Sequence, residues 1–154
     1  MDKSLFKHTI QVRVRNYEID WQGIVHNANY LLYCEVGRLE YFKNIGLPVD
    51  MHSINESSKI VLVRNEIDYK QSAKFDDVLN VYTRVSFIKN TSFGVEGMLE
   101  RDKSGELIAE NVAYHVWLDS STDRPKQVPE DFRNLVRKFE GNNCEILQPK
   151  VIRT

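Results

Sequence analysis

One loop in this sequence collects residue types that can work on a carbonyl group. Asp20 lies in it, Gly23 permits a sharp turn, and the pair His26-Asn27 stands just before a helix-like segment. A carboxylate can attack a carbonyl carbon or activate a water molecule, and the free N–H groups of a helix N-terminus can stabilise the resulting oxyanion. Taken alone, however, an aspartate between two elements more often caps a turn.

Periodicity predicts the elements on either side of this loop. Apolar residues alternate with polar ones over residues 10–14, which predicts a strand with one buried face. Residues 29–45 are apolar around nearly the whole helical circumference, which is typical of a buried helix. Asn27 and Asn29 are both suitable N-caps. Gly37 inside the helix costs ~1 kcal/mol against alanine, so we expect another element to approach closely there.

The rest of the chain is mostly strand-like. A period of two recurs over residues 61–69, 79–87, 93–99 and 108–118, and an amphipathic helix is expected near residues 130–139. The breaks between the last three strands are short, so these strands should be antiparallel neighbours. The order predicts an α+β fold, in which a curved antiparallel sheet wraps around a long central helix. One sheet and one helix leave surface uncovered, so we expect subunits to pair.

Composition limits the class of protein. The chain has 154 residues, of which 42% are apolar and 28% charged, with a net charge of −1, so we expect one domain over residues 1–154. The charge balance argues against nucleic-acid binding, and no apolar run is long enough for membrane insertion. Residues 1–10 lack the apolar core of a secretory signal. Cys34 and Cys144 are expected to be reduced thiols, which favours a cytoplasmic protein.

Residues 17–30 resemble the active-site signature of a known family, the 4-hydroxybenzoyl-CoA thioesterase-like branch of the hotdog-fold acyl-CoA thioesterases. The matching residues are Asp20, Gly23, Ile24-Val25, His26-Asn27 and, ten positions after the aspartate, Tyr30. The similarity continues through Glu35 and Arg38, Tyr69 and Asp77, and the pair Thr91-Ser92. It covers about residues 8–120, followed by a C-terminal helix and tail at 129–154. Ser72 departs from the proline common in the family.

The resemblance implies a hotdog fold and hydrolysis of an acyl-CoA thioester. It assigns Asp20 as nucleophile or general base and the backbone amide near Asn27 as the group that polarises the carbonyl. The substrate-binding residues that we expect are Gly23, Val25, His26, Tyr30, Lys89, Thr91 and Ser92. No metal and no redox cofactor are expected, since CoA is part of the substrate. The assembly should be a homo-oligomer, either a dimer or a dimer of dimers (a tetramer).

Several alternatives stay open at this stage. The carrier of the acyl group could be acyl carrier protein (ACP) instead of CoA, or the chain could be a non-catalytic acyl-thioester binding module of the same fold. Glu35 is an alternative catalytic carboxylate, although an ion pair with Arg38 is the simpler role. His26 has no second ligand at metal spacing, and Tyr30 could serve packing alone. Lys70, Lys74 and Arg64 are further candidates for contacts with the CoA phosphates.

Overall fold

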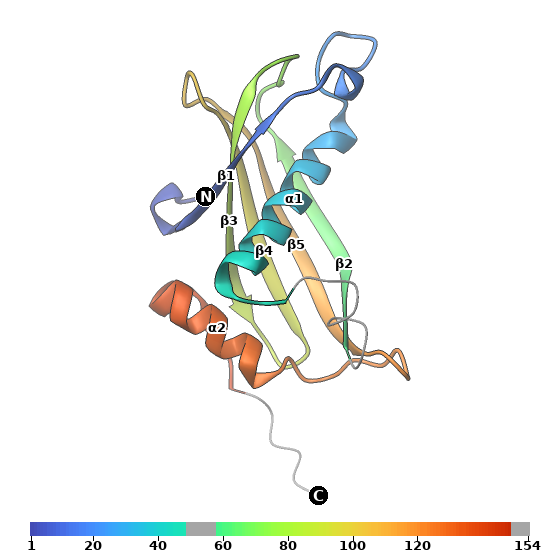
Figure 1. The fold of residues 1–154 in the computed structure, drawn as a ribbon, viewed down its shortest axis with the longest axis vertical. Coiled ribbons are helices and arrows are strands. Elements are labelled where there is room, and N and C mark those ends of the chain that lie inside the picture. The colour runs from blue at the N-terminus through green and yellow to red at the C-terminus, as the bar shows by residue number, and fades with distance from the viewer. Residues whose placement is uncertain (49–57, 149–154) are drawn as a thin grey trace, which may run out of the picture. The chain divides into compact units, whose positions relative to one another are not determined.

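The computed structural model describes residues 1–48 and 58–148, so most of the polar segment after the first helix and the last residues of the expected tail lie outside the described residues. Figure 1 shows the elements. In chain order they are η1 (Lys3–Leu5), β1 (His8–Arg13), η2 (Asn16–Glu18), α1 (Asn27–Ile45), β2 (Ser58–Tyr69), β3 (Val78–Ile88), β4 (Ser92–Arg101), β5 (Leu107–Asp119), α2 (Glu130–Glu140), η3 (Gly141–Asn143) and β6 (Glu145–Ile146).

The strands of the described residues form one six-stranded sheet. Its order is β1-β3-β4-β5-β2, and the short β6 pairs with β3. β1 runs antiparallel to β3, with Val12 opposite Leu79, whereas β6 runs parallel to β3. The predicted strands, the long helix and the helix near residues 130–139 are therefore all present, and the fold class is α+β as expected.

The chain divides into two compact units. The first comprises Met1–Tyr41, Glu66–Arg84 and Glu96–Val112, and the second comprises Phe42–Asn65, Val85–Val95 and Ala113–Thr154. The loop with Asp20 and most of α1 belong to the first unit, together with parts of β2 to β5. The residues singled out around this loop therefore share one compact unit.

In the first unit α1 lies close against β3. A Cβ atom at Gly37 would come within 2.7 Å of Val81 Cγ1 and 2.8 Å of Thr83 Oγ1, which is inside normal contact distance. The expectation that another element approaches the helix at this glycine is confirmed. The buried core around the contact includes Tyr30, Tyr33, Cys34, Leu79, Val81, Leu99 and Ile108.

The other side of the same helix is uncovered within one chain. Leu32, Val36 and Leu39 are 53%, 44% and 42% exposed, so the helix is less buried than its composition predicts. The reason is that one chain supplies a sheet for only one face of this helix. Glu35 is exposed as well. The described residues show no direct ion pair between Glu35 and Arg38, although the charge of Glu35 acts to raise the Arg38 pKa; buried Arg38 donates to Asn111 Oδ1 at 3.4 Å.

The second unit has an aromatic core. Phe93 lies at its centre, stacked on His115 with a centroid distance of 4.9 Å and tilted against Phe132 at the same distance. Trp117 packs on Phe132 at 5.1 Å. Buried Arg133 of α2 donates to four backbone carbonyl oxygens, those of Lys89, Asn90, Val128 and Leu147. These bonds hold α2 against the β3–β4 turn, because a buried guanidinium must have its donors satisfied.

Two expectations about the whole sequence can also be compared with the structure. Cys34 and Cys144 are both buried, and neither is in a disulfide. Among the helices of residues 1–48 and 58–148, none is long and apolar enough to cross a bilayer.

Candidate active site

A tight, hydrogen-bonded turn carries the aspartate singled out from the sequence. The N–H of Asp20 donates to Ile24 O at 2.8 Å, and the N–H of Gly23 donates back to Asp20 O at 3.1 Å. Gly23 has φ +80°, a conformation that side-chain-bearing residues rarely adopt. On either side of the turn, Ile19 and Val25 form an antiparallel bridge. The chain thus reverses at Gly23, as expected from the sequence, and brings Val25 back beside Ile19.

The carboxylate of Asp20 has one bound and one unbound oxygen. Its Oδ1 accepts the Gln22 N–H at 2.7 Å, which is the turn-capping role that an isolated aspartate was expected to have. No hydrogen bond to Oδ2 is present among the described residues. The side chain is half-buried. The same carboxylate can therefore cap the turn and still react with a substrate, because the cap fixes the side chain through Oδ1 and leaves Oδ2 available.

The N-terminus of α1 differs from the prediction in one respect. The cap comes from His26, whose Nδ1 accepts the Ala28 N–H at 3.1 Å and whose carbonyl accepts the Asn29 N–H at 2.9 Å. The expected caps Asn27 and Asn29 lie inside the helix. Sequence patterns favour asparagine at this position, and a histidine Nδ1 serves instead because it is an equally short-range acceptor when unprotonated.

The caps at this helix end leave one backbone N–H without an acceptor in the described part of the chain. His26 occupies the N–H groups of Ala28 and Asn29, whereas no acceptor for the N–H of Asn27 is found in the described part of the chain. Asn29 is tied further by its side chain, which donates to Glu18 O at 2.9 Å. The first N–H of the helix is thus left for a ligand at the positive end of the helix dipole.

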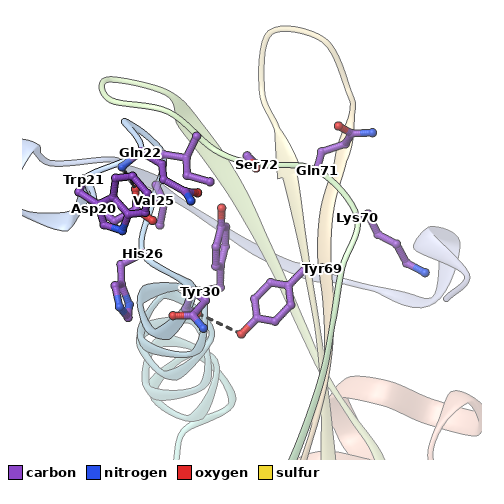
Figure 2. A pocket seen from close by; sticks show the side chains of 12 residues that line it. Asp20, Trp21, Gln22, Val25, His26, Tyr30, Tyr69, Lys70, Gln71 and Ser72 are labelled. Carbon is purple, nitrogen blue, oxygen red and sulfur yellow. Dashed lines mark hydrogen bonds between the residues drawn. The ribbon is translucent and has the colours of Figure 1, made fainter.

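Two tyrosines hold this helix end against the neighbouring chain segments. The hydroxyl of Tyr69, at the end of β2, donates to Asn27 O at 3.1 Å (Figure 2). The hydroxyl of buried Tyr30 accepts the Ala73 N–H at 3.0 Å. The two rings meet edge to face, 5.4 Å apart. Burial raises the pKa of Tyr30, so its hydroxyl is neutral at physiological pH.

A cavity of about 550 Å³ joins these groups, a size within the range of small-ligand sites. Its lining residues are Asp20, Trp21, Gln22, Ile24, Val25, His26, Asn27, Tyr30, Tyr69, Lys70, Gln71 and Ser72. Six of the residues considered from sequence thus line one cavity: the proposed catalytic pair, Val25, His26 and Tyr30, and Lys70, one of the candidates for the CoA phosphates.

The other chosen residues lie elsewhere. Gly23 shapes the turn without appearing in the cavity lining. Lys89, Thr91 and Ser92 belong to the second unit, at the β3–β4 turn, where the Lys89 N–H donates to Ser92 O at 2.8 Å. The Lys89 ammonium lies 5.2 Å from the centroid of the Phe87 ring. A role of these three in substrate binding stays a prediction. Glu35, the alternative carboxylate, is not in the lining either.

The sequence did not predict every residue of the cavity wall. Periodicity places Tyr69 in a strand and gives no reason to include Gln71 or Ser72 in the site. The available signal was the polar run that begins at Lys70, directly after a strand of period two. Ser72, the departure from the family's proline, also accepts a hydrogen bond through its carbonyl from Arg101 Nη2 at 2.6 Å.

Comparison with known proteins identifies the family. Residues 14–136 match the model of the thioesterase-like superfamily. The chain belongs to this superfamily. A putative acyl-CoA thioesterase, YneP of Bacillus subtilis, is 31% identical over 131 residues, which is 84% of this chain and 93% of the relative. The acyl-acyl carrier protein thioesterase ATL2 of Arabidopsis thaliana is 30% identical over 134 residues, which is 86% of this chain and 70% of the relative.

Solved structures agree on the fold. A thioesterase of Thermus thermophilus, crystallised with coenzyme A and zinc, superimposes with a TM-score of 0.78 at 30% identity, over 89% of this chain and 96% of that one. A 1,4-dihydroxy-2-naphthoyl-CoA thioesterase of Synechocystis gives 0.77 at 19% identity, over 83% and 93%. Together with the sheet and helix described above, this makes the fold of the present chain the hotdog fold. In its described residues no group of three or more His, Cys, Asp or Glu side chains could hold a metal ion.

Proposed function

We propose that this protein hydrolyses the thioester bond of an acyl-CoA, releasing a free acid and CoA. The observation that carries the proposal is the meeting, at one cavity, of a fixed carboxylate with an unbound oxygen and a helix N-terminal residue whose N–H has no acceptor in the described chain. Family membership and the names of the relatives support the same reaction class.

Asp20 and the Asn27 N–H have complementary roles in the proposed reaction. With the thioester carbonyl oxygen at the Asn27 N–H, the carbonyl carbon becomes electrophilic, and the negative charge that develops on the oxygen is stabilised by this donor and the helix dipole. A new C–O bond forms and the C–S bond breaks. The sulfur leaves as a thiolate and is protonated to the thiol of CoA.

Two routes deliver the new oxygen. In the first, Asp20 attacks the carbonyl carbon and forms a mixed anhydride, which water then hydrolyses to restore the carboxylate. In the second, Asp20 removes a proton from a water molecule as the water oxygen adds to the carbon. After a single turnover in H₂¹⁸O, an unlabelled product acid together with ¹⁸O in the Asp20 carboxylate identifies the anhydride route with attack of water on the aspartyl carbonyl, because the general-base route always places ¹⁸O in the product acid.

The proposal is tested with Asp20→Asn. An asparagine Oδ1 can still accept the Gln22 N–H, so the turn should remain intact while the carboxylate is lost. Release of free thiol from a panel of acyl-CoAs should fall by about 10²- to 10⁴-fold, with an unchanged circular dichroism spectrum and melting temperature. Equal activity of wild type and variant would overturn the assignment of Asp20.

A second candidate reaction has specific support, since ATL2 is named as acting on acyl-acyl carrier protein. The same acyl group should therefore be presented on both CoA and acyl carrier protein, and kcat/KM compared. A non-catalytic binding module of the same fold predicts saturable acyl-CoA binding without release of thiol from either carrier. The reaction as proposed takes water as its co-substrate and includes no step for a metal or redox cofactor.

A further inference from the structure

The walls of the cavity differ in chemistry from one side to the other. The turn after Asp20 supplies apolar surface mainly through exposed Trp21 and half-buried Ile24, beside polar Gln22, whereas the chain that follows β2 supplies polar Lys70, Gln71 and Ser72. Figure 2 shows Trp21 and Gln22 together with Asp20 on one side of the view and Gln71 and Lys70 on the other, with the rings of Tyr30 and Tyr69 between them.

Trp21 is unusual in its exposure. Its side chain is 91% exposed, although it lines the cavity and sits in a turn fixed by hydrogen bonds. The turn would form equally well with a polar residue here, because its bonds involve the backbone and the Asp20 carboxylate. An exposed indole on this fixed turn, beside the reacting carboxylate, supplies apolar surface that a bound acyl group can cover.

Lys70 is the cation at the opposite end. It is exposed, it lines the cavity, and its ammonium group forms no ion pair in the described part of the chain. The neighbouring Gln71 carries an amide, which can both donate and accept hydrogen bonds. An unpaired ammonium next to an amide suits a ligand segment with amide groups and a phosphate.

We propose, as an inference that rests on the proposed hydrolysis, that the substrate lies across this cavity in one defined direction. Its acyl group packs on Trp21, and its phosphopantetheine arm, the segment that CoA and acyl carrier protein share, lies along Gln71 and Lys70. The thioester carbon between them is then at Asp20 and the Asn27 N–H. Trp21 sets acyl preference, and Lys70 sets the requirement for the carrier's phosphate.

The Lys70 part is tested with thioesters of one acyl group on four carriers: CoA, acyl carrier protein, pantetheine without phosphate, and N-acetylcysteamine. Lys70→Ala should raise KM several-fold for the two phosphorylated carriers, leave kcat nearly unchanged, and have no effect on the other two. Lys103→Ala, an exposed lysine outside the cavity lining, is the matched control. Equal KM values for wild type and Lys70→Ala on CoA and acyl carrier protein would overturn this assignment.

The Trp21 part is tested by binding as well as by turnover. The chain has two tryptophans, and Trp117 is buried, so a non-hydrolysable thioether analogue of acyl-CoA should change mainly the fluorescence of Trp21. Trp21→Ala should abolish this change and weaken discrimination between acyl groups on every carrier. Tyr17→Ala, another exposed aromatic outside the lining, is the control. An unchanged acyl preference in Trp21→Ala would contradict the proposal.

These experiments separate the direction of binding from the reaction itself. If no carrier is hydrolysed but the analogue still quenches Trp21 and Lys70→Ala weakens its binding, then the proposed function fails and the direction of binding stands. If hydrolysis is normal and neither variant differs from its control, then the direction of binding is wrong and the function stands.

Discussion

At the scale of single residues, the site depends on a few hydrogen bonds that each leave one useful atom unoccupied. Asp20 caps its own turn through Oδ1, and His26 takes the second and third N–H groups of the helix but not the first. Neither feature is visible as a special motif in the sequence, because each bond is of an ordinary capping type. Their combination within one cavity is what makes them chemically relevant.

Tyr69 should act as a positioning residue for the helix N-terminus. Its hydroxyl donates to Asn27 O, and Tyr69→Phe removes this bond while keeping the ring contact with Tyr30. We expect kcat to fall a few-fold at nearly constant KM, because a net hydrogen bond contributes about 1 kcal/mol. Steady-state kinetics on acyl-CoA check this. A change in KM alone would instead place Tyr69 in substrate binding.

Alkaline pH should weaken the fold through groups buried in their neutral forms. Burial raises the pKa of the Cys34 thiol from 9.0 to about 12 and raises the pKa of Tyr33 well above its usual value. Above pH 9 the unfolded chain releases the thiol proton while the folded chain retains it, so the free energy of unfolding falls as pH rises from 9 toward 12. Urea unfolding at a series of pH values from neutral to alkaline measures the slope, and Cys34→Ala should reduce it.

At the scale of elements, the close approach of α1 and β3 makes Gly37 hard to replace. Alanine favours the helix by ~1 kcal/mol, but its Cβ would meet Val81 and Thr83 below 3 Å, and overpacking costs about 1–3 kcal/mol. Gly37→Ala should therefore lower the free energy of unfolding by up to about 2 kcal/mol. Chemical denaturation measures this, with exposed Asn44→Ala as the control. A stabilised Gly37→Ala variant would show that the contact is loose.

Periodicity predicted most of the elements because each long segment has one consistent spacing of apolar residues. The strands over 79–87 and 108–118 and the helix near 130–139 correspond to β3, β5 and α2. What periodicity could not supply were partners distant in sequence. Arg38 pairs with Asn111 rather than with nearby Glu35, and Tyr69 reaches Asn27 across 42 residues, because tertiary packing and not local spacing decides such contacts.

At the scale of the whole molecule, the uncovered face of α1 is the feature that most needs a partner. Leu32, Val36 and Leu39 recur at helical spacing and are all more than 40% exposed, an arrangement typical of an interaction surface. We expect a second copy of the chain to cover them, in a dimer or a dimer of dimers. The self-complementary pairing of such a helix about a two-fold axis is the simplest closed arrangement.

Val36→Glu tests this pairing, since it places a charge in the middle of the exposed apolar row. Light scattering after size-exclusion chromatography should give the wild type a mass of at least two chains and should shift the variant toward the mass of one chain. Lys103→Ala, on an exposed turn, should leave the mass unchanged. A wild type with the mass of a single chain would contradict the expectation.

The contact at Gly37 also restricts how the cavity can adapt. Ten residues separate this point from Asn27, about 15 Å of helix, and the side chains of Val81 and Thr83 on β3 leave no space there even for an added Cβ. At this point the helix therefore cannot move closer to the sheet to make space for a bulkier acyl group. Substrates of different size must then be accommodated by rotation of side chains on the loop, where Trp21 is the largest. The breadth of substrate choice and the rigidity of the reacting groups are therefore determined by different segments of the chain.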